Sequence, residues 1–293
     1  MDIDLITNIL YATIRTGTPL ILIALGEMVC EKSGVLNLGQ EGMLLVGAVV
    51  GFIAATVTGS LFIAVWFAIA AGVLMALLFG FLAISLASNQ VATGLALTIF
   101  GAGLSAFLGS SYVGIGLDGM QPIAIPLLSD IPVVGKILFQ HDPLVYVAFV
   151  LFLAVFWLFK SSRLGLQIRA VGENPEAANA IGINVQAIRY MAVLFGGAMT
   201  GLAGAYLSLV YTPMWSEGMS AGRGWIALAL VVFASWKAER IMLGAYLFGF
   251  ASILHLVLQG TRFEVPPILW RCCRMSRPLW CWYGCPATPL KPA

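Results

Sequence analysis

Charged side chains are scarce in this chain of 293 residues: Asp, Glu, Lys and Arg together make up 10% of it, whereas hydrophobic residues make up 60%. Soluble globular domains average about 45–50% apolar and about 25% charged residues. The shortage of charge therefore excludes a soluble globular domain and indicates an integral membrane protein. Because each spanning helix needs about 20 apolar residues, the length leaves room for about eight to ten crossings.

Patterns that carry catalytic or metal chemistry are also missing. The sequence has no G-x-x-x-x-G-K-[ST] motif, so the chain cannot hydrolyse ATP with a P-loop of its own. It has no His/Glu metal spacing, no nucleophile elbow and no paired catalytic carboxylates. We therefore expect no catalytic residue, metal or cofactor on this chain, and no nucleic-acid partner.

Cysteine is nearly absent before residue 267, where Cys30 alone forms no disulfide framework. The other four cysteines lie in a tail, residues 267–293, that is rich in Cys, Trp, Arg and Pro. Metal binding is one interpretation, although no His accompanies these cysteines and no C-x-x-C pair occurs. A reading-frame shift is the hypothesis we favour, because a last apolar span is expected here and Arg271, Arg274 and Arg277 interrupt it.

Cations are absent from most of the first half, where Lys136 is the only Lys or Arg between Lys32 and Lys160. The next basic residues then gather around one polar stretch, residues 169–183; they are Lys160, Arg163, Arg169 and Arg189. By the positive-inside rule this stretch is predicted to lie in the cytoplasm.

The polar stretch contains the ends of a very short helix. Asn174 is a good N-cap, Pro175 suits the first helical position, Glu176 suits the positive end of the helix dipole, and Gly182 can adopt a left-handed conformation after the last turn. About 7 residues are too few for a helix that is stable alone, since isolated helices need about 12–15. With its small residues Ala177, Ala178 and Ala180, the stretch is predicted to dock on another protein. The alternative is an ordinary amphipathic cytoplasmic loop.

Apolar runs elsewhere predict an all-α, polytopic transmembrane helix bundle with about eight or nine spans and a broken or re-entrant segment after the first helix. Residues 1–266 form this domain. The expected helices are Ile6–Leu25, Met43–Val57, Leu61–Leu86, Val91–Leu108, Leu144–Phe159, Met191–Tyr211, the short run Trp225–Trp236, and Ile241–Leu258.

The predicted break, residues 26–43, mixes carboxylates and glycines between two apolar runs. Irregular backbone at membrane depth is tolerated only where it is buried in protein or lines a watery path. A translocation path is therefore predicted at Asn37, Gln40 and Glu41, together with Asn89 and Gln90 at a second polar break. The alternative is that these side chains only satisfy the backbone of the broken helices.

Two further features concern packing inside the membrane. Arg15 lies within the first apolar run, where it either lines a wet cavity or is structural, snorkelling to the interface or forming an internal ion pair. Gly197-x-x-x-Gly201 with Gly204 predicts close helix packing, and Gly94, Gly101 and Gly103 predict the same for the helix that contains them.

Four segments together give the chain a resemblance to a known family: Glu31-Lys-Ser-Gly-Val-Leu-Asn-Leu-Gly-Gln-Glu-Gly-Met43, Asn89-Gln-Val-Ala-Thr-Gly-Leu-Ala-Leu97, Gly172-Glu-Asn-Pro-Glu-Ala-Ala-Asn-Ala-Ile-Gly-Ile-Asn184 and Ala221-Gly-Arg-Gly-Trp-Ile-Ala-Leu-Ala-Leu230. Over about residues 10–266 the chain resembles permeases of bacterial ABC importers for simple sugars and nucleosides, which are close to the branched-chain amino-acid permeases. After residue 266 it departs from their pattern.

The resemblance implies a multi-pass protein of the bacterial cytoplasmic (inner) membrane whose coupling helix sits on a separate ATP-binding subunit. Residues of that element are Gly172, Glu173, Asn174, Pro175, Glu176, Ala177, Ala178 and Gly182. ATP and Mg are expected on the partner. A second permease, identical or paralogous, and a periplasmic or lipoprotein solute-binding protein are expected as well.

The expected solute is a nucleoside or a related sugar-containing molecule, because the segments look more like the nucleoside branch than the ribose branch. A permease for simple sugars such as ribose is the alternative. An ion-coupled secondary transporter is a competing class, but it needs an intramembrane ion site, and away from the polar breaks this chain offers little beyond His255.

Overall fold

A computed structural model describes residues 3–124 and 134–260, and in this part the chain is almost entirely helical. The long helices are α1 (Ile3–Lys32), α2 (Gln40–Thr58), α3 (Leu61–Gly80), α4 (Gln90–Gly109), α6 (Pro143–Ser161), α9 (Val185–Tyr206) and α11 (Ala238–Gly260). The shorter helices are α5 (Val134–Leu138), α7 (Arg163–Glu173), α8 (Pro175–Ala180) and α10 (Arg223–Phe233). Two-residue strands, β1 (Ile123–Ala124) and β2 (Gln140–His141), pair antiparallel in the loop between α4 and α6.

The predicted all-α membrane bundle is confirmed. Seven helices in the described part are long and apolar enough to cross a membrane, and α10 adds a shorter apolar helix. The prediction of about eight or nine membrane spans was approximate. The tail from residue 267, with its predicted frameshift, lies outside the described residues.

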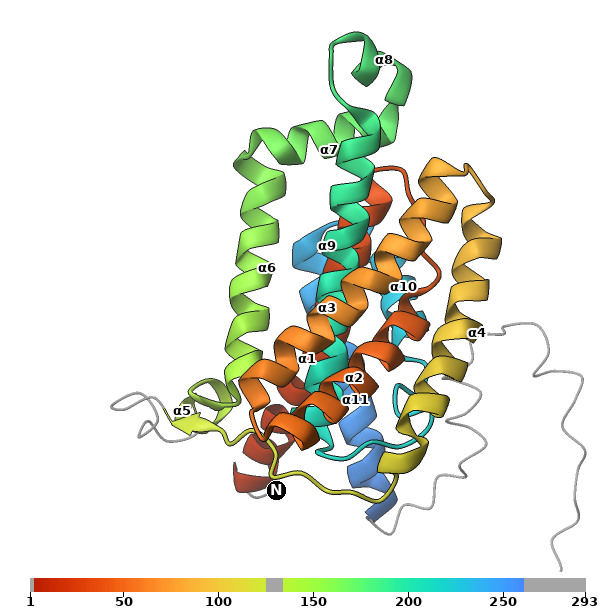
Figure 1. Ribbon diagram of the computed structural model, residues 1–293. Coiled ribbons are helices and arrows are strands. Elements are labelled where there is room, and N and C mark those ends of the chain that lie inside the picture. Colours follow the sequence, from red (N-terminus) through yellow and green to blue (C-terminus); the bar gives the residue numbers. More distant parts are fainter. Residues whose placement is uncertain (1–2, 125–133, 261–293) are drawn as a thin grey trace, which may run out of the picture. The chain divides into compact units, whose positions relative to one another are not determined.

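The centre of the bundle, in residues 3–252, is built on α9, which packs against α1, α2 and α3. Helix α2 also contacts α3 and α4, while α1 contacts α6 and α10. Figure 1 shows α9 running among these helices, with α7 and α8 beyond one end of it. Residues 253–260 form the last turns of α11, where the side chains of His255 and Gln259 are hydrogen-bonded.

Glycines make the contacts around α9 close, as the small-residue pattern predicted. A Cβ atom built at Gly204 would lie 2.6 Å from the amide nitrogen of Ala48 on α2, and one built at Gly197 would lie 2.6 Å from the carbonyl oxygen of Gly72 on α3. Gly101 of α4 faces Gly42 of α2 in the same way. Gly103 does not fit the prediction, because a Cβ atom built there would have nothing within 4 Å.

Two helices end in wider turns. Helix α3 continues as a π-helical turn (Phe81–Ser85), and α9 continues as another (Leu207–Tyr211). A π turn leaves a carbonyl group out of the regular α-helical pattern. In the second turn the carbonyl of Val210 accepts a hydrogen bond from the guanidinium of Arg15.

The break after the first helix is shorter than predicted. Helix α1 continues to Lys32, so that only residues 33–39 are irregular. The acidic residues that favoured an earlier end are accommodated within the helix: the fully buried Glu27 accepts hydrogen bonds from the backbone of Asn37 and the side chain of Gln40, and Glu31 accepts one from the indole of Trp236. Internal partners thus replace the water that a loop would have supplied.

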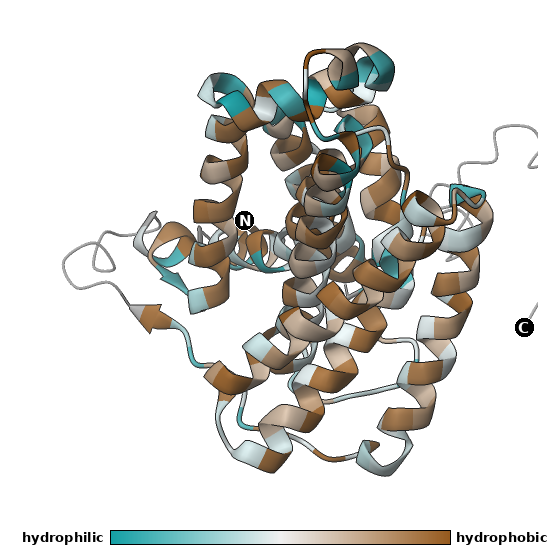
Figure 2. Cartoon of the chain, turned by 45° about the horizontal axis from the view of Figure 1, so that its top comes forward, coloured by the Kyte–Doolittle hydropathy of each residue, from teal (hydrophilic) through white to brown (hydrophobic). Residues whose placement is uncertain are grey.

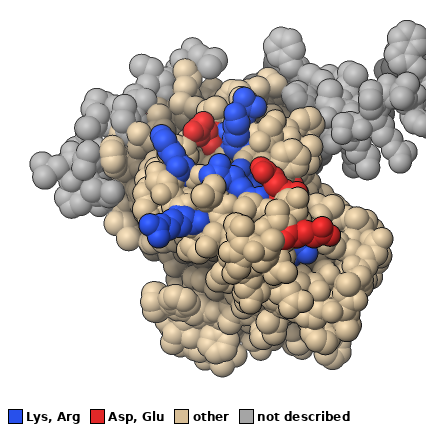
Figure 3. Space-filling view, turned by 90° about the horizontal axis from the view of Figure 1, so that it is seen from above, with Lys and Arg blue, Asp and Glu red and all other residues tan. Residues whose placement is uncertain are grey.

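Polar residues concentrate at the end of the bundle that carries α7 and α8. Figure 2 shows hydrophilic residues on α7 and α8 and mainly hydrophobic residues along the long helices. Seen from that end, Lys and Arg side chains gather on one face (Figure 3). Its cations include Lys160 in the last turn of α6 and Arg163 and Arg169 on α7. The positive-inside rule places this end in the cytoplasm.

Candidate functional site

The predicted docking helix is present as α8, with the predicted caps. The side chain of Asn174 accepts a hydrogen bond of 3.0 Å from the amide of Ala177, and Pro175 occupies the first turn. Gly182 adopts φ +87°, the left-handed conformation predicted for it, in the loop that follows α8. Glu176 lies in the first turn of the helix.

Helix α7, which was not predicted, lies between α6 and α8. Ser162 caps it by accepting a hydrogen bond of 3.0 Å from Gly165, and its buried residues are Gly165, Ile168 and Val171. This spacing of three residues and the N-cap serine are the signals that would have identified it. The helix is amphipathic and extends the cytoplasmic element beyond the docking stretch.

One buried residue of α8 joins the main hydrophobic core of the bundle. Ala178 is 2% exposed and belongs to the same hydrophobic cluster as Val171 of α7 and Ile188 of α9. The opposite side of α8 is open, since Glu176, Ala177 and Asn179 are exposed. A helix of six residues is therefore anchored on one side and available to a partner on the other.

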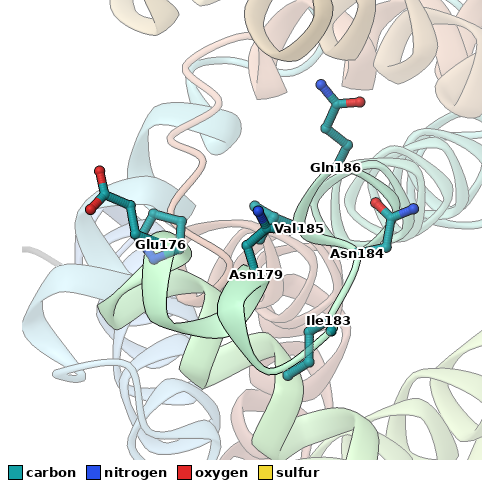
Figure 4. A pocket seen from close by; sticks show the side chains of 8 residues that line it. Glu176, Asn179, Ile183, Asn184, Val185 and Gln186 are labelled. Atoms are coloured by element: carbon teal, nitrogen blue, oxygen red, sulfur yellow. The ribbon is translucent and has the colours of Figure 1, made fainter.

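A groove of about 600 Å³ lies between α8 and the start of α9. Figure 4 shows the labelled side chains on its walls. The lining residues are Pro175, Glu176, Asn179, Gly182, Ile183, Asn184, Val185 and Gln186. Glu176 is the one charged residue among them. Glu173, predicted to be part of the same element, is exposed at the end of α7.

The docking stretch is in direct contact with the break after α1. A Cβ atom built at Gly172 would lie 3.0 Å from the carbonyl carbon of Lys32 and 3.3 Å from the amide nitrogen of Gly34. In addition, the guanidinium of Arg189 on α9 donates a hydrogen bond to the carbonyl of Ser33. The backbone of α7 thus packs against the backbone of the break without an intervening side chain.

The break itself is held by a buried polar network. Glu27 accepts a hydrogen bond of 2.9 Å from the amide of Asn37 and another from the side chain of Gln40, whose oxygen accepts one from Thr200 on α9. The side chain of Asn37 accepts a hydrogen bond of 2.9 Å from the amide of Gly39. All four side chains are fully buried. The first turn of α2 is therefore fixed to both α1 and α9.

Glu41, the next residue, reaches in another direction. Its carboxylate accepts hydrogen bonds from the hydroxyl of Ser220 at 2.5 Å, the amide of Gly222 at 2.9 Å and the amide of Gly224 at 2.6 Å. Gly222 and Gly224 lie at the start of α10. An acidic side chain from α2 thus caps the start of a helix whose bonded amides lie 181 and 183 positions later in the sequence.

The second polar break is closed by Asn89 and Gln90. Asn89 is exposed and caps α4 by accepting hydrogen bonds from the amides of Val91 and Ala92. The side chain of Gln90 accepts a hydrogen bond of 2.9 Å from the amide of Leu36. Gln90 therefore joins this break to the one after α1.

The structure brings four of the five predicted path residues together around residues 36–41, and Asn89 adjoins them through Gln90. Their hydrogen bonds satisfy backbone and side-chain groups of the broken helices. This is the arrangement expected if the residues are structural and do not line a path. Contact with a solute stays a prediction. Sequence reasoning missed the partners Thr200 and Ser220. Thr200 is a single hydroxyl residue in a long apolar helix, and Ser220 lies in a polar loop. Neither position gave a local indication that its hydroxyl faces a distant amide or carboxylate.

Arg15 forms the internal ion pair that was one of its interpretations. Its Nε lies 3.1 Å from Oδ2 of Asp142, and its Nη2 donates a hydrogen bond of 2.9 Å to the carbonyl of Val210. His141, next to Asp142, stacks on Tyr11 of α1 with ring centroids 4.6 Å apart. This group, Tyr11, Arg15, His141, Asp142 and Val210, is called the outer clasp below.

Burial is the main cause of the pKa shifts of Asp142 and His141, the two loop residues of the outer clasp that ionise. Burial raises the pKa of the Asp142 carboxyl above its usual range, even though the Arg15 guanidinium and His141 act in the opposite direction. Burial also lowers the pKa of the His141 imidazole, although that ring donates a hydrogen bond of 2.7 Å to the carbonyl of Ile137. His141 is therefore neutral at pH 7.

The fold and the site define a class: polytopic membrane proteins with a short capped helix on their basic end. Comparison with known proteins gives the family. The model of the family described as "Branched-chain amino acid transport system / permease component" matches residues 9–272, and the chain belongs to this family. It is thus a permease component of the ABC transporter type and a multi-pass protein of the cytoplasmic (inner) membrane, not an enzyme.

Several curated relatives are similar over most of their length. A protein of Haloferax volcanii named "Putative glucose ABC transporter permease protein TsgC13" is 44% identical over 89% of this chain and 80% of its own. The guanosine ABC transporter permease protein NupQ of Bacillus subtilis is 35% identical over 88% of this chain and 85% of its own. The nucleoside ABC transporter permease protein NupC of Lactococcus lactis is 33% identical over 82% of this chain and 80% of its own.

One solved structure is similar in fold. It is described as "An inward-facing conformation of a putative metal-chelate type ABC transporter", and it aligns with a TM-score of 0.50 and 14% identity over 90% of this chain and 81% of that chain. At this identity the likeness concerns the fold alone. As a permease component, the chain works with ATP-binding and substrate-binding partners.

Proposed function

We propose that this chain is the permease subunit of an ATP-driven importer that translocates a nucleoside or a related sugar-containing solute. Two relatives that are 33% and 35% identical to this chain over the aligned residues are named for nucleosides and guanosine, respectively. A simple sugar is the second candidate, because the relative at 44% identity is named for glucose. In this proposal a periplasmic or lipoprotein binding protein delivers the solute, and a second permease, identical or paralogous, completes the membrane part.

The coupling element carries the proposal. Residues 172–183 contain the short capped helix α8 on the basic end of the bundle, which is anchored through Ala178 and open on the side of Glu176 and Ala177. In the proposed complex this open side contacts an ATP-binding subunit that holds ATP and Mg, and this chain binds no cofactor itself. The groove beside α8 offers a carboxylate and three amide side chains to that partner.

The proposed path begins at the polar network of residues 36–41. A nucleoside or sugar carries many hydrogen-bonding groups and little charge, so amides that exchange for water one at a time suit it. Asn37, Gln40, Asn89 and Gln90 provide such amides close to Glu41. We therefore propose that these four amides line the path, whereas the carboxylate of Glu41, which was also predicted for the path, is occupied by donors of the protein itself. The loop between the end of α9 and α10, residues 212–222, is called the outer segment below.

Gly182 offers a direct test of coupling. At φ +87° a β-branched residue is strained, yet nothing lies within 4 Å of a Cβ built there, so Gly182→Val changes the backbone and not the packing. We expect the variant to reach the membrane at normal levels and to lose solute-stimulated ATP hydrolysis in the assembled complex.

Gly59 provides the matched control. It has φ +66° and equally open surroundings, but it follows α2, at the other end of that helix from the cytoplasmic break. Gly59→Val should carry the same local strain and keep stimulation. Equal stimulation in both variants would refute the coupling assignment. Uptake of labelled guanosine, competed by ribose or glucose, would identify the solute class in the same preparation.

A further inference from the structure

The start of α10 lies inside the bundle and depends on a residue from another helix. Helix α10 has only 11 residues, and its N-cap is Gly222, which has no side chain to offer. Glu41 takes over that role with three hydrogen bonds of 2.5–2.9 Å. Its side chain is nearly buried, at 8% exposure.

No cation competes for this carboxylate in the described residues. Arg223, the nearest candidate in sequence, donates to the carbonyls of Met219 and Ser220 and lies over the ring of Tyr211. The one ion pair found in residues 3–124 and 134–260 is that of Arg15 with Asp142. The charge of Glu41 is therefore balanced by backbone amides and by the positive end of the α10 dipole.

The contact between α2 and α10 is also close in the backbone. A Cβ built at Gly224 would lie 2.7 Å from the amide nitrogen and the Cα of Glu41. The two helix starts therefore touch, and three hydrogen bonds lock them. A shift of the first turn of α2 must carry the start of α10, and with it segment 212–222, in the same direction.

The first turn of α2 is in turn connected to the coupling element. Gln40 is bonded to Glu27 and Thr200, and the preceding residues of the break pack on Gly172. A continuous set of backbone and side-chain contacts thus runs from residue 172 through residues 33–41 to residues 220–224. Each step in it is a direct contact between packed groups, as energetic coupling between distant sites requires.

We infer that Glu41 is a positioning residue that transmits movement of the coupling element to the outer segment 212–222. Rather than binding the solute, Glu41 acts through the segment that it holds. The inference rests on the proposed function, because it assigns a role within the ATP-driven cycle. It also explains why a carboxylate is needed: three donors converge on two acceptor oxygens.

Glu41→Gln is the sharpest test. The amide has the same size, but its NH₂ group faces donors, so at least one backbone N–H of Gly222 or Gly224 loses its acceptor inside the protein. The contact is weakened while packing is kept. Glu217→Gln is the matched control, since Glu217 is an exposed carboxylate on the same outer segment.

The variants would be compared in the complete complex in lipid nanodiscs, with the five native cysteines replaced by Ser and the exposed Ser216 changed to Cys. Labelling of residue 216 with a water-soluble maleimide would be timed without nucleotide and with trapped Mg-ATP and vanadate. Unmodified Glu41 should give a labelling rate that depends on nucleotide. In Glu41→Gln this dependence should disappear, and solute-stimulated ATP hydrolysis should fall about fivefold to tenfold while basal hydrolysis persists.

The outcomes separate the two levels of the proposal. If the reference complex shows no solute-stimulated hydrolysis, the proposed function is wrong. If it shows stimulation and Glu41→Gln retains both stimulation and the nucleotide-dependent labelling, the positioning role is wrong. A raised KM for the solute with unchanged maximal stimulation would also overturn it, because that pattern indicates direct binding.

Ser220→Ala keeps the test decisive if Glu41→Gln fails to assemble. It removes one of the three hydrogen bonds and leaves the carboxylate with both amides. A smaller reduction of nucleotide-dependent labelling at residue 216, with Glu217→Gln unaffected, supports the role of Glu41. Unchanged labelling in Ser220→Ala would contradict it.

Discussion

The inner and outer helices of this bundle differ in how much of their surface is buried and in the residues that they place there. Within the central 18-residue windows of the spans, 83% of α9 and 72% of α1 are buried, compared with 17% of α11 and 22% of α4. The inner helices contain the polar network and most of the close glycine contacts, whereas the outer ones expose large apolar side chains such as Ile99 and Phe107. In lipid, apolar surface gains little from burial. Close packing and internal hydrogen bonds must therefore determine which helices lie inside the bundle.

The largest expected effect comes from adding bulk to an inner glycine. Gly204→Leu would place side-chain atoms against the backbone of Ala48 and Leu44, where even a Cβ lies 2.6 Å from both. Backbone cannot yield as a flexible side chain does, so we expect a loss of about 3 kcal/mol or more and little folded protein. Gly103→Leu on α4, where nothing lies within 4 Å, is the control. Similar yields of monodisperse protein from both variants would mean that inner and outer helices do not differ in this way.

A medium effect is expected at the outer clasp, which joins α1 to the loop before α6. Asp142→Asn removes the carboxylate and leaves the guanidinium of Arg15, whose side chain is 29% exposed, with neutral acceptors such as the carbonyl of Val210. Breaking a buried pair costs about 3–5 kcal/mol, and partial exposure reduces this to about 2 kcal/mol. Thermal unfolding in detergent should show the lower stability, and Arg15→Met with Asp142→Asn should recover part of it. An unchanged midpoint in Asp142→Asn would show that the clasp contributes nothing.

The smallest expected effect is a pH dependence of the same clasp. Because the pKa of His141 is lowered in the folded protein, the unfolded state binds its proton first as pH falls. Stability from neutral His141 is present above the unfolded value of about 6.5 and is lost as pH falls through it toward the folded pKa. The raised pKa of Asp142 acts with the opposite sign, since protonation of Asp142 favours the folded state, so the net loss of stability between pH 7.5 and 5.5 is small. Unfolding midpoints of the reference protein should fall over this range more than those of His141→Gln. Parallel curves would exclude His141 as the cause.

Local patterns predicted the ends of α8 well because they are determined by nearest neighbours. Asn174, Pro175 and Gly182 each act within a few residues of the backbone that they shape. The same is true of the long apolar helices and of the glycines that face α9. Helix α7 was missed although its N-cap and spacing were available, because its cations suggested a loop.

Long-range contacts could not be predicted in the same way. Glu27, Gln40 and Thr200 meet only because α1, α2 and α9 pack together, and the role of Glu41 depends on backbone amides near residue 222. A polar side chain in an apolar segment indicates that a partner exists, but many partners satisfy the same donor or acceptor. Arg15 illustrates this, since an ion pair and a wet cavity were equally consistent with its position.

The cap on α10 has an electrical consequence. The starts of α2 and α10 each carry about half a positive elementary charge, and the carboxylate of Glu41 between them carries one negative charge. Within residues 212–224 the charges of Glu217 and Arg223 cancel, so the two helix starts together with this segment are close to neutral. Moving a full charge through 100 mV requires about 2.3 kcal/mol, whereas a neutral unit moves without that work. In the proposed cycle, the step that carries segment 212–222 is therefore driven by the ATP-binding subunit and is insensitive to the membrane voltage.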